Sequence, residues 1–219
     1  MDDPYRLYLV VRRGAFEDLE TGGVLAGAAA VACLERFGAD PAHAEAVAAW
    51  RARPGKVTLR ARGGQWPQVL DLPHALAGDP DGAAVAALPP RRRSERGELL
   101  ERLQAMSSEL EPAPVLGDGE PPAAADGRLT YLVNPALEMS SGKTLAQIAH
   151  AATMAAARPD LAGWVAAGCP ARVRVPAPVV FAALCGAGGL AAEVQDAGLT
   201  EVAPGTVTVL AVAPALRPC

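Results

Sequence analysis

The chain has 219 residues, enough for one large domain or two small ones, and about half of them are apolar. Its formal net charge of −4 does not suggest a strongly basic nucleic-acid binder, so any contact with RNA would need a local patch. Uninterrupted apolar runs stay short of a membrane span, which argues against a transmembrane helix. The acidic start at Met1 does not resemble a signal peptide, and the four scattered cysteines fit neither a disulfide scaffold nor a metal site. We therefore expect a cytoplasmic protein that uses no metal or other cofactor.

The first half of the chain alternates strand and helix signals. Alanine dominates the helix-favouring stretches, and Pro54-Gly55 marks a turn before a strand. Leu99, Leu103 and Met106 recur at helical spacing in a charged segment. In chain order we expect a strand at 5–12, helices at 24–36 and 41–50, a strand at 56–61, a helix or loop at 65–77, a strand at 83–88 and an amphipathic helix at 94–110.

The second half repeats this order after segment 111–127, whose Pro, Ala, Gly and acidic residues predict a linker. The expected elements are a strand at 129–134, a helix at 142–157, a segment at 161–167, a strand at 171–175, a helix at 177–187 and strands at 190–195 and 206–213. Alternating strands and helices predict an α/β fold, with helices on the faces of a mixed four-stranded sheet in a three-layer α/β/α arrangement.

The two halves align with each other, which suggests a tandem duplication. Leu25-Ala26-Gly27 matches Leu145-Ala146-Gln147, and Trp50 matches Trp164. The alternative is that two alanine-rich α/β halves look alike by composition alone. In this alignment Lys143, Gln147 and His150 fall opposite Gly23, Gly27 and Ala30. The first half then has no reactive side chain at the matching helix positions, so we expect it to be structural.

The segment 139–152 is the most specific in the chain. Ser140 or Ser141 is a natural helix N-cap, and Gly142 allows close approach of another backbone. Lys143 then lies in the first turn, where the helix dipole opposes a cation, and this mismatch makes it a functional candidate. Gln147 and His150 follow at i+4 and i+7, on the same face of the helix as Lys143.

The run Ser-Gly-Lys-Thr at 141–144 looks like the end of a phosphate-binding P-loop. That motif requires a glycine five residues before Gly142, where this chain has Leu137. The nucleotide-hydrolase interpretation is therefore disfavoured. A second segment, 195–212, joins a strand end to the last strand, and its Asp196, Thr200 and Thr208 are able to converge at one strand edge.

These two segments resemble the type II peptidyl-tRNA hydrolases. The first has the family pattern Met-x-x-Gly-Lys-x-x-Ala-Gln-x-x-His-Ala, and the second has Asp-Ala-Gly-x-Thr-x-x-x-x-Gly-x-x-Thr-Val-Leu. The resemblance covers residues 128–216. The chain departs from the family at Leu199, where Arg or another polar residue is common, and at Ser140-Ser141, which replace a more basic pair.

The resemblance implies hydrolysis of the ester that joins a peptide to the 3′ end of tRNA. It implies a catalytic set that consists of Lys143, Asp196, Gln147, Thr200 and Thr208, and substrate contacts from Gly142, His150 and Ser141. Lys143 would stabilise the oxyanion or hold a phosphate, and Asp196 would orient Lys143 or activate water. The Arg91-Arg92-Arg93 run is a solvated face or, beside the cleft, a contact for tRNA phosphates.

The family commonly pairs two identical subunits, so a duplicated chain is expected to form that pair within one polypeptide and to be a monomer. The expected domains are a degenerate repeat with its amphipathic helix at 1–110, the linker at 111–127 and the hydrolase-like domain at 128–219. Two alternatives stay open. The chain is a binding protein that holds tRNA or another partner without cleaving it, or it is an unrelated small-molecule enzyme on the same scaffold.

Overall fold

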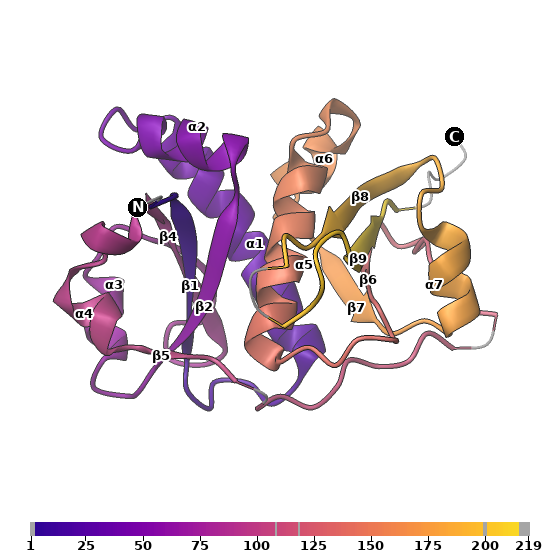
Figure 1. Ribbon diagram of the computed structural model, residues 1–219, viewed down its shortest axis with the longest axis horizontal. Coiled ribbons are helices and arrows are strands. Elements are labelled where there is room, and N and C mark those ends of the chain that lie inside the picture. The colour runs from indigo at the N-terminus through magenta and orange to yellow at the C-terminus, as the bar shows by residue number, and fades with distance from the viewer. Residues whose placement is uncertain (1–2, 108, 118, 199–200, 215–219) are drawn as a thin grey trace.

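The chain forms two β-sheets with two long helices packed between them (Figure 1). The computed structural model describes residues 3–107, 109–117, 119–198 and 201–214. The first half contains β1 (Arg6–Arg12), α1 (Leu19–Gly38), α2 (Ala44–Ala52), β2 (Gly55–Ala61), α3 (Trp66–Leu70), β3 (Ala75–Gly78), β4 (Ala84–Arg91), α4 (Gly97–Arg102) and β5 (Gln104–Ala105). The second half contains β6 (Leu129–Val133), α5 (Ser141–Ala156), α6 (Ala162–Ala166), β7 (Ala171–Arg174), α7 (Pro178–Leu184), β8 (Leu190–Gln195) and β9 (Val207–Val212). Short 3₁₀ helices lie at Arg93–Glu95 and Pro159–Leu161.

The expected α/β class is confirmed, and both sheets are mixed. The first sheet has the order β3-β4-β1-β2-β5, and the second has the order β7-β6-β9-β8. In the first, β1 runs parallel to β2 and antiparallel to β4, which pairs with β3. In the second, β6 runs parallel to β7 and antiparallel to β9, which pairs with β8. The two halves therefore share strand order and direction, except for the added edge strand β5.

The helices α1 and α5 form the centre of the molecule (Figure 1). They pack on each other and on the facing sides of the two sheets, and the main apolar clusters lie here. Gly23 makes this close approach possible, because a Cβ atom there would lie 2.8 Å from the Ile148 Cδ1 atom and 2.8 Å from the Val173 Cγ2 atom. The helices α3 and α4 pack on the outer face of the first sheet, and α7 packs on the outer face of the second.

The predicted amphipathic helix at 94–110 is wrong beyond its first turns. It is limited to α4, because Leu103 adopts an extended conformation and the chain then pairs with β2 through β5. The Met106 N–H donates to the Thr58 carbonyl at 3.0 Å and extends this pairing. Since the edge of β2 would otherwise expose unpaired backbone groups, sheet pairing outweighs the weak helical periodicity of this segment.

The predicted linker at 111–127 is anchored to the second half. The Leu116 N–H donates to the Val175 carbonyl, and the Val175 N–H donates to the Pro114 carbonyl, each at 2.9 Å. Arg172 is buried and forms an ion pair with Glu120. Its guanidinium also donates to the Thr130 hydroxyl at 2.9 Å. Residues 114–116 and 120–121 of the predicted linker are therefore docked beside β7 and do not form a free connection.

Candidate functional site

The helix α5 begins with a defined cap that sets the position of Lys143. The Ser140 hydroxyl accepts the Lys143 N–H at 3.2 Å. Ser140 in turn donates its own N–H and its hydroxyl to the carboxylate of Glu201, at 2.7 Å each. Because the cap fixes where the helix starts, Lys143 lies in the first turn as the sequence predicted. Glu201 was not predicted, because a loop glutamate gives no signal in the sequence.

Lys143, Gln147 and Asp196 meet in one cluster. Lys143 forms an ion pair with Asp196, and their side chains are only 13% and 9% exposed. The Gln147 amide donates to the same carboxylate oxygen, Oδ2, at 2.6 Å. Two of these groups come from consecutive turns of α5 and the third from the residue that follows β8. The structure therefore unites the two sequence motifs at one place.

Asp196 is held firmly in its charged form. Its Oδ1 atom accepts the Gly198 N–H at 2.8 Å, and its backbone pairs with Gly205 and Thr206 across the base of the loop between β8 and β9. Burial raises the pKa of Asp196, but hydrogen bonds from Lys143, the Gly198 N–H and Gln147 outweigh burial and leave the pKa below its usual value. A carboxylate with a lowered pKa and these donors is a weak proton acceptor and a good anchor for the ammonium.

The threonines of the second motif are placed differently. Thr208 is fully buried in β9, and its hydroxyl donates to the Val194 carbonyl on the neighbouring strand at 3.1 Å. In this structure the Thr208 hydroxyl therefore links β9 to β8 and does not donate to the Lys–Asp–Gln cluster. Thr200, like Leu199, lies outside the described residues.

Ser141 and Gly142 are buried, because residues that precede them by about 30 positions pack on the start of α5. The Ser141 hydroxyl accepts the N–H groups of Glu109 and Leu110, at 3.1 Å each. A Cβ atom on Gly142 would lie 2.3 Å from the Met106 carbonyl oxygen. The sequence predicted a close backbone approach at Gly142, and the approaching backbone is that of Met106. Met106, Glu109 and Leu110 thus cover one side of the start of α5.

Replacing Gly142 by alanine is expected to destabilise the protein by about 1–3 kcal/mol, because the new methyl group meets a backbone atom that cannot rotate away. Helix propensity alone predicts the opposite sign, by about 1 kcal/mol. Urea unfolding measures the difference. Gly163→Ala in α6 is the matched control, since its Cβ atom would meet nothing within 4 Å. A G142A protein as stable as wild type would contradict the packing of Met106.

His150 lies two turns beyond Lys143 and contacts the first half of the chain. Its Nδ1 atom lies 2.5 Å from the Nζ atom of Lys56 in β2. Its ring packs edge-on against Trp50 of α2, with the centroids 6.4 Å apart. Burial, and then the charge of Lys56, lower the pKa of His150 to about 3, so the imidazole is neutral.

The sequence argument missed Lys56. Gly23, Gly27 and Ala30 have no reactive side chain, but Lys56 in β2 of the same half contacts His150 of α5 through its amine. A compositional signal was present, because Lys56 and Lys143 are the only lysines among the 20 Lys and Arg residues of the chain.

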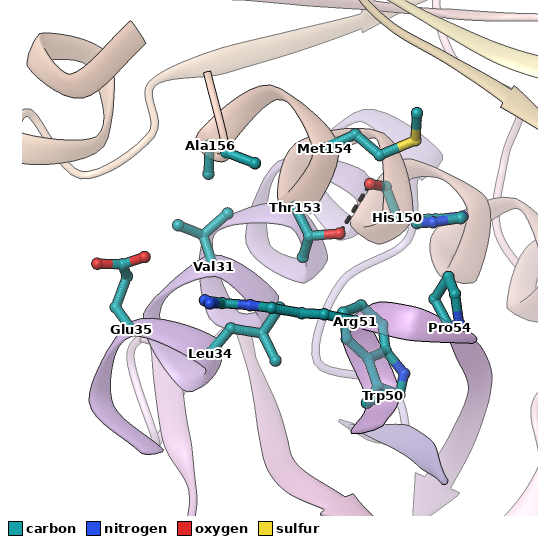
Figure 2. A pocket seen from close by; sticks show the side chains of 11 residues that line it. Val31, Leu34, Glu35, Trp50, Arg51, Pro54, His150, Thr153, Met154 and Ala156 are labelled. Carbon is teal, nitrogen blue, oxygen red and sulfur yellow. Dashed lines mark hydrogen bonds between the residues drawn. The ribbon is translucent and has the colours of Figure 1, made fainter. Parts of the chain in front are cut away.

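A pocket of about 440 Å³ opens beside His150, between α1, α2 and α5. Figure 2 shows Trp50, Arg51 and Pro54 of the first half on one side and His150, Thr153 and Met154 of α5 on the other. Its walls are largely apolar, and Glu35 and Arg51 add charges. The pocket is thus built by both halves, two helical turns from the Lys143–Asp196 pair.

The fold and the site together define a mixed α/β protein with a Lys–Asp–Gln cluster at the start of a central helix. Comparison with known proteins finds no family model and no solved structure that matches this chain. Among the described residues, no helix is long and apolar enough to cross a membrane. Within those same ranges, no group of three or more His, Cys, Asp or Glu side chains is arranged to hold a metal ion.

Proposed function

We propose that this chain hydrolyses the ester bond of peptidyl-tRNA and releases a peptide and tRNA. The observation that carries the proposal is the meeting of Lys143, Gln147 and Asp196, which belong to two motifs about 50 residues apart and form one hydrogen-bonded cluster. Both motifs resemble those of type II peptidyl-tRNA hydrolases, and the catalytic set implied by that resemblance includes these three residues.

Lys143 supplies the positive charge of the reaction. Water attacks the ester carbonyl, and the carbonyl oxygen becomes an oxyanion that the Lys143 ammonium stabilises. The bond to the ribose 3′ oxygen then breaks, and that oxygen takes up a proton. Because Lys143 lies in the first turn of α5, the developing anion would also lie near the positive end of the helix dipole.

Asp196 and Gln147 prepare Lys143 for this role. Asp196 orients the ammonium, which fits its lowered pKa better than service as a general base. Gln147 is 1% exposed, and its Oε1 atom has no hydrogen-bond partner within the described part of the chain. A water molecule or a substrate hydroxyl would satisfy this acceptor beside the reacting ester.

The duplication belongs to the same proposal. The two halves form an intramolecular pseudo-dimer, each with a sheet between helical layers, that arose from a tandem repeat. The shared strand order supports this, and so does an equivalent detail: the Trp50 indole donates to the Gly55 carbonyl at 2.6 Å, and the Trp164 indole donates to the Pro170 carbonyl at 2.9 Å. We expect a cytoplasmic monomer of 22.4 kDa whose partner is tRNA.

The direct test is the release of a labelled N-blocked aminoacyl group from tRNA by the wild-type protein. The expected result is catalytic turnover that leaves the tRNA intact and able to be charged again. If the protein binds tRNA without turnover, it is a binding protein and not an enzyme. If it neither binds nor turns over peptidyl-tRNA, the proposed function is wrong and only the fold assignment holds. Light scattering after size exclusion tests the monomer, and a dimer would contradict the pseudo-dimer.

A further inference from the structure

The strand β2 of the first half faces the candidate site. Val57, Leu59 and Ala61 of this strand belong to the apolar cluster on the outer face of its sheet. Because side chains alternate along a strand, Lys56 points to the inner face, where α5 packs on β2. A residue from the half without the motifs thus reaches the helix that carries Lys143.

Lys56 interacts electrostatically with Lys143 and Asp196. Burial, and then the positive charge of Lys143, lower the pKa of Lys56, and Asp196 opposes them; the net result is a pKa of about 7. Asp196 is a compensating charge for Lys56, but its carboxylate already accepts hydrogen bonds from Lys143, Gln147 and the Gly198 N–H. The neutral His150 adds no charge. Lys56 is therefore an amine that loses its proton close to neutral pH.

The choice of amino acid is informative in this chain. Its Lys and Arg residues are almost all arginine. Lys143 lies in the first turn of α5, and Lys56 of the other half contacts His150, which lies two turns further along the same face of that helix. A guanidinium stays protonated in proteins, whereas a buried lysine amine can release and accept a proton. A lysine at position 56 is therefore chemically able to transfer a proton, which an arginine there would not be.

We propose that the site is shared between the two halves and that Lys56 is its proton acceptor. The reaction rests on the proposed hydrolysis. The neutral Lys56 amine takes a proton from the attacking water as the new bond to the ester carbon forms. When the bond to the ribose 3′ oxygen breaks, the Lys56 ammonium returns that proton to the leaving oxygen. Lys143 carries the charge of the oxyanion throughout, so the two lysines have separate tasks.

His150 positions Lys56 for this step. Its Nδ1 atom accepts a hydrogen from the Lys56 amine, which corresponds to an imidazole with its proton on Nε2. Trp50 packs edge-on against the imidazole, and Figure 2 shows Trp50 and His150 in the wall of the same pocket. The lone pair of the neutral amine is then free of the imidazole and available to water.

The kinetic test compares wild type, K56M and K56R on N-blocked aminoacyl-tRNA from about pH 5.5 to about pH 8.5, with uncatalysed hydrolysis subtracted. Only neutral Lys56 accepts a proton, so the wild-type rate should rise with pH through a midpoint near 7. Both variants should lose about 100-fold or more and lack this midpoint, while they still bind tRNA. Full rescue by K56R would mean that Lys56 supplies charge alone and would overturn the proposal, as would a K56M rate within about threefold of wild type. R62M, which removes an exposed cation just beyond β2, is the control.

A second test needs no substrate. Protein made with ¹³Cε-lysine shows two lysine resonances, and the one lost in K143M identifies Lys143. The Lys56 resonance should titrate near pH 7 and shift to a higher midpoint in K143M, because the neighbouring charge is gone. If wild type releases no aminoacyl group but this coupling is found, the hydrolase proposal fails and the shared site stands. A Lys56 midpoint above about 9, or one that K143M leaves unchanged, would refute the shared site.

Discussion

Replacing Lys143 by methionine is expected to lower kcat/KM for peptidyl-tRNA by at least about 100-fold, the loss typical of removing one oxyanion donor. The aliphatic stem of methionine preserves much of the packing, so the change isolates the ammonium. The measurement is release of the labelled N-blocked aminoacyl group under conditions where the rate is proportional to enzyme and substrate. R102M is the control, because Arg102 is an exposed cation paired with Glu98 on α4.

Stability and activity should separate in the double variant. K143M leaves the Asp196 carboxylate with its charge partner removed, which is expected to cost roughly 1–3 kcal/mol. K143M/D196N removes that uncompensated charge, so it should regain stability without regaining activity. If K143M kept wild-type activity, the proposed role of Lys143 would be wrong. If the double variant recovered both properties, loss of fold would explain the single variant.

Trp164→Ala is expected to cause the largest loss of stability, about 3–5 kcal/mol, because it leaves a cavity in the core and an unpaired Pro170 carbonyl. Trp164 is 6% exposed and packs with the apolar cluster between α5 and the second sheet. W164F retains a ring and loses only the indole hydrogen bond, so it should lose about 1–3 kcal/mol. Urea unfolding measures both changes.

The shape of the transition also tests the architecture. Since α1 and α5 share one core, W164A should still unfold in a single step at a lower urea concentration. Two separate transitions would show that the halves are stable independently, against the pseudo-dimer. A loss below about 1 kcal/mol would show that Trp164 is not a core residue.

Much of the site could be predicted from local patterns. Lys143 and Gln147 lie one turn apart on α5, and an α-helix places such residues on one face wherever the helix is. Asp196 follows β8 directly and is held by the Gly198 N–H, a turn that the Asp-Ala-Gly sequence favours. The helix start, the strand ends and the turn are local features, so the sequence alone placed these residues on their elements, and the resemblance to a family singled them out as a set.

Other features depended on contacts between distant segments. Leu99 lies in α4, but Leu103 adopts an extended conformation, and the residues after it pair with the open edge of β2 as a strand. The sequence predicted a close backbone approach at Gly142, but only the structure identifies the approaching backbone as that of Met106, 36 positions earlier in the chain. In both cases the two contacting segments are far apart in the sequence, so no local pattern in either one indicates the other.

The sequence by itself determined the α/β class and most of the order of strands and helices, because these follow from periodicity, turn chemistry and helix capping. The set of Lys143, Gln147 and Asp196 followed from the resemblance of two motifs to the type II peptidyl-tRNA hydrolases. The tertiary structure decided that Met106, Glu109 and Leu110 cover the start of α5 and that Lys56 contacts the same helix that carries Lys143. Both depend on how the two sheets pack around α1 and α5, and such packing is set by the shapes of buried surfaces, to which residues far apart in the chain contribute together.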